Sequence, residues 1–351
     1  MNVRRFPTTA EISREAGVNK STVSRALKAD PRISEATRKR ILEIAESMGY
    51  APNAIAQSLA TNNSNIVAFV GSETQNYWYQ ENIQTLARQV TQAGRQLMLF
   101  QVMRGGTIDD VIPQMIQYRV AGCIVIPAVE MTDTAAERLR QFGISMVLLN
   151  RPGEAFGASS VRQDQAEGGR GVAHFLVAGG HRRIAFIAGN MNPAAQDRER
   201  GFLAGLKEIG VEPFAIDRGE FTFRGAYAAA TRLLQAEVRP DAIFAANDMM
   251  AYATIEAARA AGLTVPDDLS VVGYDNGRVG AWPGFRLTTV AQPIERMFGD
   301  ALGLILDRQD KPDLPPDRVG IAAGLLIRDS ARVPEDLGAL PIDCRRDGPF
   351  G

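Results

Sequence analysis

From Asn65 onward, short apolar segments rich in β-branched residues alternate with intervals long enough to hold a helix. Such segments lie at 66–70, 96–102, 123–126, 144–149, 184–188, 242–246 and 269–272. Parallel strands need long crossover connections, usually helices, whereas antiparallel strands can be joined by short turns. The alternation therefore predicts an α/β body with open parallel sheets, in which a ligand binds at the carboxyl ends of the strands.

The first fifty residues show a different, helical pattern. Thr8 followed by Glu11 forms a capping box, so a helix is expected to begin directly after Thr8. Gly17 tolerates the left-handed conformation that ends a helix, and Asn19 caps a second helix shortly afterwards. This spacing predicts an all-α helix-turn-helix head, completed by a third helix that Ser34 caps.

The second helix carries the candidate DNA-binding side chains. Val23 and Leu27 share its apolar face, and polar side chains occupy the other face. The second helix of a helix-turn-helix contacts base edges in the major groove. The predicted DNA-binding residues on this helix are Lys20, Ser21, Thr22, Ser24 and Arg25. An ordinary amphipathic helix pair would show the same spacing and is the alternative that this pattern leaves open.

Charge is distributed unevenly along the chain. Residues 1–61 contain ten Lys or Arg and six Asp or Glu, a net charge of +4, whereas the remainder contains 29 against 34, a net charge of −5. A basic head on an acidic body fits contact with a polyanion at one end. Solvated surface charge explains so small an excess nearly as often.

Composition and motifs disfavour several other classes of protein. The two cysteines, Cys123 and Cys344, have no disulfide or metal-ligand spacing, and no apolar stretch reaches the length of about eighteen residues that a membrane helix needs. The two histidines, His174 and His181, are accompanied by no phosphate-binding loop and no nucleophile elbow. We therefore expect a cytoplasmic protein that is not an enzyme and needs no metal or cofactor.

Several sequence blocks carry a resemblance to a known family. The N-terminal blocks are TAEISREAGVNKSTVSRAL, PRISEATR and MGYAPNAIAQSL, which run without a gap from about Thr8 to Leu59. Later blocks are GGHRRIAFIAG, DRERGF, AIFAANDMMA, SVVGYDN and LTTVAQP, which extend the match to about Arg332. In this order they resemble the lactose-repressor (LacI) family, of the GalR type, of transcriptional regulators.

The resemblance implies a division of the chain. The expected parts are a DNA-binding domain at 1–50, a hinge helix and linker at 51–64, and an effector-binding and dimerisation domain at 65–332. The last is expected to be two-lobed, as in periplasmic sugar-binding proteins, with sub-lobes at about 65–161 plus 291–322 and about 162–290 plus 323–332. The hinge segment is too short for a stable isolated helix, and in the family it orders on DNA, with the leucine matched by Leu59 in the minor groove. The tail at 333–351 is rich in Pro, Gly and charge and is expected to be disordered.

The resemblance also implies an effector site between the sub-lobes. Arg198, three residues before Gly201, matches an arginine that clamps effectors, and Asp275 matches a carboxylate that accepts ligand hydrogen bonds. Phe221 and Asn247 match further pocket positions. Without the resemblance, an Asp or Arg after a strand would more often be a cap or an ion-pair partner.

One loop departs from the family pattern. After the first strand the family commonly has an Asn-Pro-Phe-like turn, whereas this chain has SETQNYWY at 72–79. We expect Tyr77 or Trp78 to stack on the ligand, with a core or dimer contact as an equal alternative. Asn150 and Arg151, at the end of another strand, are further candidates, and two arginines near one pocket favour an acidic sugar over a neutral one.

The combined prediction is a homodimeric, DNA-binding transcriptional repressor. It is expected to bind a near-palindromic double-stranded operator, to have no membrane partner, and to respond to a carbohydrate-derived effector bound between the sub-lobes. A transport-type sugar-binding protein without a DNA role is one alternative, although it would need export and would not use the head. A DNA-binding dimer whose body takes no ligand is another.

Overall fold

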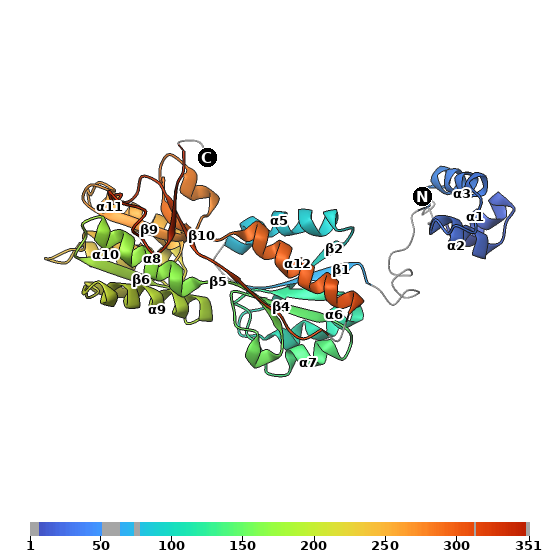
Figure 1. The fold of residues 1–351 in the computed structure, drawn as a ribbon, viewed down its shortest axis with the longest axis horizontal. Coiled ribbons are helices and arrows are strands. Elements are labelled where there is room, and N and C mark those ends of the chain that lie inside the picture. Colours follow the sequence, from blue (N-terminus) through green and yellow to red (C-terminus); the bar gives the residue numbers. More distant parts are fainter. Residues whose placement is uncertain (1–6, 51–63, 74–77, 312–313, 349–351) are drawn as a thin grey trace. The chain divides into compact units, whose positions relative to one another are not determined.

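The computed structural model describes residues 7–50, 64–73, 78–311 and 314–348. The chain divides into two compact units, Met1–Ser64 and Asn65–Gly351 (Figure 1). Among the described residues, every helix is too short or too polar to cross a lipid bilayer.

The first unit is built from α1 (Thr9–Ala16), α2 (Lys20–Leu27) and α3 (Glu35–Ser47). Both halves of the Thr8–Glu11 capping box are present, and Gly17 ends α1 with a φ of 63°. Asn19 occupies the N-cap position of α2, but its side chain makes no capping hydrogen bond. The helices enclose a small core that consists of Ile12, Ala16, Val23, Ala26, Ile41 and Ala45. The predicted helix-turn-helix is therefore correct.

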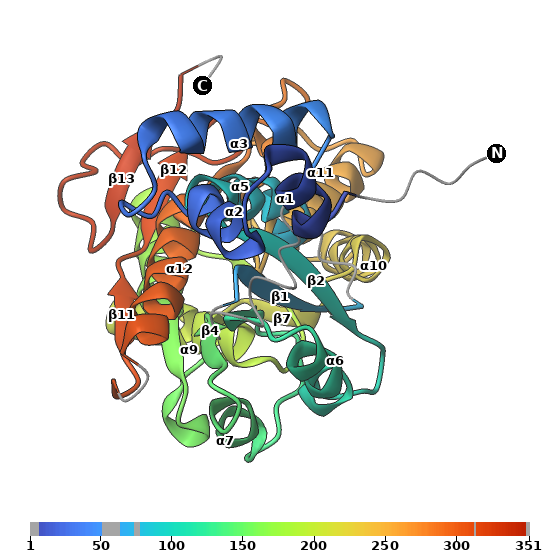
Figure 2. The same cartoon turned by 90° about the vertical axis from the view of Figure 1, so that its right-hand side faces the viewer.

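The second unit consists of two lobes, each built on its own sheet. The sheet of lobe 1 has the strand order β11-β5-β4-β3-β1-β2, and every pair of neighbours is parallel. Its strands are β1 (Ile66–Ser72), β2 (Gln96–Val102), β3 (Gly122–Val125), β4 (Ser145–Leu149), β5 (Ser159–Gln163) and β11 (Arg318–Ile321). Helices α5 (Trp78–Gln92) and α12 (Ile294–Asp310) lie side by side on one face, opposite α6 (Ile112–Gln117) and α7 (Ala135–Arg140) (Figures 1 and 2).

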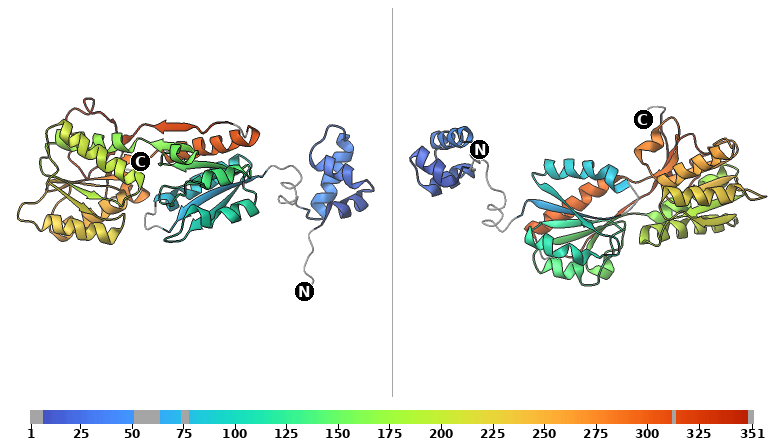
Figure 3. Two further views of the ribbon diagram at one scale, coloured as in Figure 1. Left: turned by 90° about the horizontal axis from the view of Figure 1, so that it is seen from below. Right: turned by 180° about the vertical axis from the view of Figure 1, so that it is seen from behind.

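The sheet of lobe 2 has the strand order β13-β12-β10-β9-β8-β6-β7. Its strands are β6 (Ile184–Ala188), β7 (Ala215–Arg218), β8 (Ala242–Ala245), β9 (Ser270–Asp275), β10 (Thr288–Ala291), β12 (Gly324–Ile327) and β13 (Asp343–Arg346). All neighbours are parallel except β10 and β12. The covering helices are α8 (Gln165–Ala178), α9 (Pro193–Glu208), α10 (Phe223–Leu234) and α11 (Asp248–Ala260). Helix α8 packs on α9 and α10 packs on α11, one pair on each face (Figure 3).

The two lobes are joined by crossing segments. The chain passes from one sheet to the other after β5, after β10 and after β11. These segments bring the carboxyl ends of the strands of both sheets toward each other, which is where open parallel sheets bind ligands. The prediction of a two-lobed α/β body is confirmed.

The prediction of a disordered C-terminal tail is wrong for residues 333–348, the part of the tail that the structure describes. Residues 343–346 form β13, which pairs in parallel with β12 at the edge of the sheet (Figure 2). Ile342 is only 5% exposed, and Leu337 and Leu340 also pack on the core of lobe 2. The composition of the segment hides a few well-spaced apolar residues, and their burial, together with the strand pairing, offsets the entropy lost on ordering.

Candidate functional site

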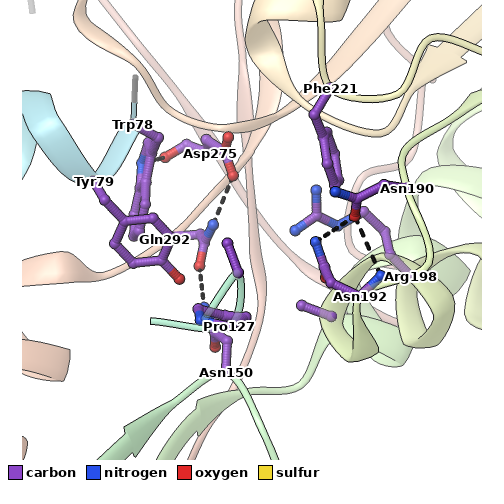
Figure 4. A pocket seen from close by; sticks show the side chains of 12 residues that line it. Trp78, Tyr79, Pro127, Asn150, Asn190, Asn192, Arg198, Phe221, Asp275 and Gln292 are labelled. Carbon is purple, nitrogen blue, oxygen red and sulfur yellow. Dashed lines mark hydrogen bonds between the residues drawn. The ribbon is translucent and has the colours of Figure 1, made fainter. Parts of the chain in front are cut away.

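A pocket lies between the two lobes, at the carboxyl ends of their strands (Figure 4). Lobe 1 and lobe 2 both contribute side chains, and Gln292 comes from the crossing segment after β10. The pocket is lined by Trp78, Tyr79, Pro127, Ala128, Asn150, Asn190, Asn192, Ala194, Arg198, Phe221, Asp275 and Gln292. We call it the inter-lobe pocket.

A chain of hydrogen bonds orients the polar groups on one side of the pocket. The backbone N–H of Gln163 donates to Asn150 Oδ1 over 3.0 Å, and Asn150 Nδ2 donates to Gln292 Oε1 over 2.7 Å. Gln292 Nε2 then donates to Asp275 Oδ1 over 2.6 Å. Because a backbone N–H can only donate, it fixes the orientation of both amides and makes Asp275 Oδ1 an acceptor. Among the described residues, no side chain hydrogen-bonds the other carboxyl oxygen of Asp275, so a ligand can reach it.

The electrostatic environment of Asp275 favours its protonated form. Burial raises the pKa of Asp275 to about 8, although the guanidinium of Arg198 opposes the shift, and the nearby Asp248 carboxyl adds to it. Burial also raises the pKa of Asp248 to about 6, against hydrogen bonds from Thr289 Oγ1 and the Gly277 N–H. The Asp275 carboxyl can therefore exchange between donating and accepting a hydrogen bond near neutral pH.

Arg198 faces Asp275 from the other side of the pocket (Figure 4). It lies on α9 and is only 4% exposed. Its Nη2 donates to Gln165 Oε1 over 2.6 Å, its Nη1 donates to the carbonyl of Ala246, and its Cζ lies 3.4 Å from the ring centroid of Tyr274. These contacts hold the guanidinium plane in one orientation, so a ligand meets a preorganised donor.

Aromatic side chains provide the apolar surfaces of the pocket. The Trp78 indole N–H donates to the carbonyl of Asp275 over 2.9 Å, and its ring meets Tyr79 edge to face, with centroids 4.6 Å apart. Phe221 enters from the opposite side, with a left-handed φ of 54°. Its ring passes so close to Gly189 that a Cβ there would lie 2.3 Å from the Phe221 Cζ, which explains the glycine. Flat apolar faces of this kind can cover the nonpolar side of a sugar ring.

Five of the eight residues predicted for the effector site line the pocket. They are Trp78, Asn150, Arg198, Phe221 and Asp275. Trp78 is the first residue of α5, and its indole N–H reaches the Asp275 carbonyl. The predicted Tyr77 lies outside the described residues.

Two of the predicted residues do not line the pocket. Arg151 points behind the wall, where its guanidinium donates to the carbonyls of Val129 and Pro127 over 3.0 Å and 2.8 Å, and burial lowers its pKa. Asn247 is 1% exposed and caps α11 by accepting from the Met250 N–H over 2.9 Å. The expectation of an acidic ligand relied on two arginines, and in the described pocket only Arg198 remains.

Sequence reasoning missed part of the lining. Tyr79, Asn190, Asn192 and Gln292 contribute polar groups, and Pro127, Ala128 and Ala194 complete the wall. Asn192 caps α9 and donates through Nδ2 to Asn190 Oδ1 over 2.7 Å. Asn190 and Gln292 both follow the carboxyl end of a strand, so the rule that ligands bind at those ends could have found them.

The candidate DNA-binding side chains share the outer surface of α2. Lys20, Ser21, Ser24 and Arg25 are exposed and Thr22 is half-buried, whereas Val23 and Ala26 are buried against α1 and α3. This arrangement presents donors and acceptors suited to base edges and phosphates. The predicted minor-groove residue Leu59 lies outside the described residues.

Comparisons with known proteins agree with this architecture. Residues 8–53 match the family model described as bacterial regulatory proteins, lacI family, and residues 172–331 match a periplasmic binding protein-like domain. The chain is 31% identical over 343 residues to the HTH-type transcriptional regulator CelR of Thermobifida fusca, which covers 94% of this chain and all of that protein. It is 28% identical over 332 residues to the probable HTH-type transcriptional repressor ExuR of Bacillus subtilis (strain 168), covering 93% and 98%.

Solved structures show the same fold. A lac repressor dimer bound to operator and the anti-inducer ONPF superimposes with a TM-score of 0.83 at 24% identity, covering 93% of this chain and 99% of that one. A complex of the transcriptional regulator CelR with cellobiose gives a TM-score of 0.67 at 30% identity, covering 92% and 99%. With its helix-turn-helix, its two-lobed body and these relatives, the chain belongs to the LacI family of bacterial transcriptional regulators.

Proposed function

We propose that this regulator is a repressor that binds a near-palindromic operator as a homodimer and that releases or retains the DNA according to a sugar bound in the inter-lobe pocket. The pocket carries this proposal, because Arg198, Asp275 and two aromatic surfaces converge there from both lobes. A ligand that contacts both lobes stabilises one angle between them, and it can thereby change the spacing of two DNA-binding heads. The dimer bound to operator and the cellobiose complex of the relatives support both halves of the proposal.

The pocket favours a neutral sugar over a sugar acid. In the described lining, the positively charged side chain is that of Arg198, and Asp275 lies across the pocket from it. An arginine and a carboxyl group together suit hydroxyl groups, which donate and accept at once, whereas a ligand carboxylate would meet a single guanidinium, that of Arg198, in the described lining. Arg151, which could have added a second positive charge, is bound to backbone carbonyls behind the wall.

A thermal-shift panel tests this ligand class. The full chain is melted with cellobiose, other neutral mono- and disaccharides, glucuronate, galacturonate and purines. We expect at least one neutral sugar to raise the Tm, because a ligand that binds only the folded state stabilises it. Stabilisation by uronates alone would contradict the neutral class, and stabilisation by purines alone would contradict the sugar proposal.

The head is tested by selecting DNA from a random pool and measuring salt dependence. We expect one near-palindromic sequence to be enriched, with affinity that falls steeply as salt rises, because phosphate contacts release counterions. If no sequence is enriched while sugars still stabilise the protein, only the alternative of a sugar-binding protein without a DNA role remains.

Arg25→Ala tests the predicted reading of bases by α2. Because an arginine that bonds a guanine edge contributes about 1–3 kcal/mol of discrimination, the variant is expected to lose that much affinity for the selected operator and to accept other bases at one position. Arg14→Ala is a matched control, since Arg14 is exposed on α1. Equal losses on operator and random DNA would show that Arg25 contacts only phosphate.

A further inference from the structure

The end of the chain is bound to a buried arginine of lobe 2. We call Asp343–Gly348 the C-terminal brace. Within it, the backbone N–H of Asp347 donates to the carbonyl of Ile327 over 3.1 Å, which continues the pairing of β13 with β12. The Asp347 carboxylate accepts from Arg328 Nε over 2.6 Å, and the Arg328 side chain is only 3% exposed. An ion pair this well buried is sensitive to the loss of either partner.

Arg328 in turn holds the turn that carries Asp275. Its Nη2 donates to Asn276 Oδ1 over 2.8 Å, and its Nη1 donates to the carbonyl of Leu287 over 2.9 Å. The three nitrogens of the Arg328 guanidinium therefore bond three segments at once. These are the brace at Asp347, the turn at Asn276, and Leu287, the residue before β10. Any change in the position of the brace is transmitted to Asn276 through one rigid planar group.

The turn has a conformation that needs external support. Asp275 has a φ of 126°, which side chains rarely adopt, and Asn276 follows it in the left-handed region, with a φ of 59° that asparagine tolerates. Such conformations persist only where surrounding contacts hold them. The contacts here include those of Arg328 with Asn276, of Asp248 with the Gly277 N–H and of Trp78 with the Asp275 carbonyl. In addition, the Asn276 N–H donates to Thr289 Oγ1 over 3.4 Å, and Gln292 Nε2 donates to Asp275 Oδ1. Among them, the contact of Arg328 depends on the C-terminal brace.

A second arginine anchors the brace independently. Arg286 donates through Nη1 to the carbonyl of Gly348 over 3.0 Å and through Nε to Asp329 Oδ2 over 3.1 Å. Removing the Asp347 carboxylate therefore leaves the brace attached at its end and by its strand pairing. The carboxylate can be tested apart from the segment that carries it.

We propose that Asp347 is a positioning residue for the effector pocket, which holds the Asp275–Gly277 turn in its binding conformation through Arg328 and Asn276. The consequence for affinity rests on the function proposed above. The structural link itself does not, because it consists of hydrogen bonds between residues of the protein.

Hydrogen exchange of the full chain without ligand tests the link. In Asp347→Asn, amide exchange in peptides covering 274–281 is expected to become about tenfold faster, because the charged hydrogen bond between Arg328 and the Asp347 carboxylate is lost. Peptides from β6 (Ile184–Ala188) should keep their wild-type rate. Asp347→Glu retains a carboxylate and should recover most of the protection. Asp343→Asn is the matched control, because Asp343 lies in the same C-terminal brace in an exposed pair with Arg345, and it should change nothing.

Arg328→Lys provides a second route if Asp347→Asn also speeds exchange in β6. Lysine keeps the positive charge but cannot bond Asp347 and Asn276 together, so the 274–281 peptides should again exchange faster. Wild-type exchange at 274–281 in Asp347→Asn, or in Arg328→Lys, would overturn the proposal. So would an equal acceleration in Asp343→Asn.

Cellobiose titration adds the functional consequence. If the wild type binds cellobiose, Asp347→Asn should weaken its affinity about tenfold, in step with the loss of protection in the turn. If cellobiose does not bind the wild type, that result counts against the sugar proposed as effector, and the exchange measurement still decides the role of Asp347.

Discussion

Replacing Asp275 with asparagine is expected to stabilise the ligand-free protein at alkaline pH and to remove most of its affinity for sugar. Burial raises the pKa of Asp275 to about 8 from its ordinary value of 3.8, so the folded protein favours the protonated acid. Between these two pKa values the folded state binds a proton that the unfolded state has lost, and the free energy of unfolding falls as pH rises. Asparagine carries no such cost.

The stability advantage of Asp275→Asn should therefore depend on pH. It should be small near pH 4 and should grow, by on the order of one kcal/mol per pH unit at most, as the pH rises toward about 8. Melting curves of both proteins across this range measure it. The second carboxyl oxygen of Asp275 can donate when protonated and accept when ionised, whereas an asparagine NH2 group in its place can only donate. Sugar affinity should therefore fall although the fold is more stable. A variant that is less stable at every pH would show that the ionised carboxylate stabilises the fold.

Replacing Arg198 is expected to have the largest effect on effector binding. Arg198→Ala removes the charged donor of the inter-lobe pocket and leaves Gln165 Oε1 and the Ala246 carbonyl without their partner. The loss of a charged hydrogen bond to the sugar costs about 1.5–3 kcal/mol. Because the wall around Gln165 and Ala246 also loses its contacts with Arg198, sugar affinity should fall by about 100-fold or more. Isothermal titration of the sugar found in the thermal-shift panel measures the effect.

Arg198→Lys separates geometry from charge. Lysine keeps a positive charge but cannot bond Gln165 and Ala246 while lying flat on the Tyr274 ring. We expect it to bind sugar nearly as poorly as alanine does. Arg218→Ala is the matched control, since Arg218 lies outside the lining and pairs with Glu199 at a half-exposed position. Wild-type affinity in Arg198→Lys would show that charge alone suffices.

The sequence predicts local structure well where the causes are local. The Thr8–Glu11 box and Gly17 define α1, and both act within one turn of the chain. The alternation of apolar segments likewise predicts the parallel sheets, because crossover helices leave a repeated pattern. The order of the tail could not be predicted from the sequence, because two apolar residues, Ile342 and Cys344, do not make a periodic pattern. Their burial depends on contacts with β12 and α8.

Pocket residues that belong to a recognisable sequence motif could be predicted. Residues whose place in the pocket depends on tertiary structure could not. Arg198 and Arg151 are both plausible clamps in the sequence, yet only the carbonyls of the 127–129 loop turn Arg151 away from the pocket. Gln292 enters the site because the segment after β10 crosses between the lobes, and the strand order that places it there is not written in local periodicity. The link from Asp347 to Asn276 joins residues far apart in sequence for the same reason.

A sugar in the inter-lobe pocket is expected to change the affinity of the protein for its operator. The direct measurement is an anisotropy titration of labelled selected operator with wild-type protein, with and without a saturating concentration of the sugar. We predict that the sugar shifts the midpoint of the wild type and that Arg198→Ala binds the operator with a midpoint that the sugar does not move. Identical wild-type curves with and without a sugar that calorimetry shows to be bound would contradict this prediction.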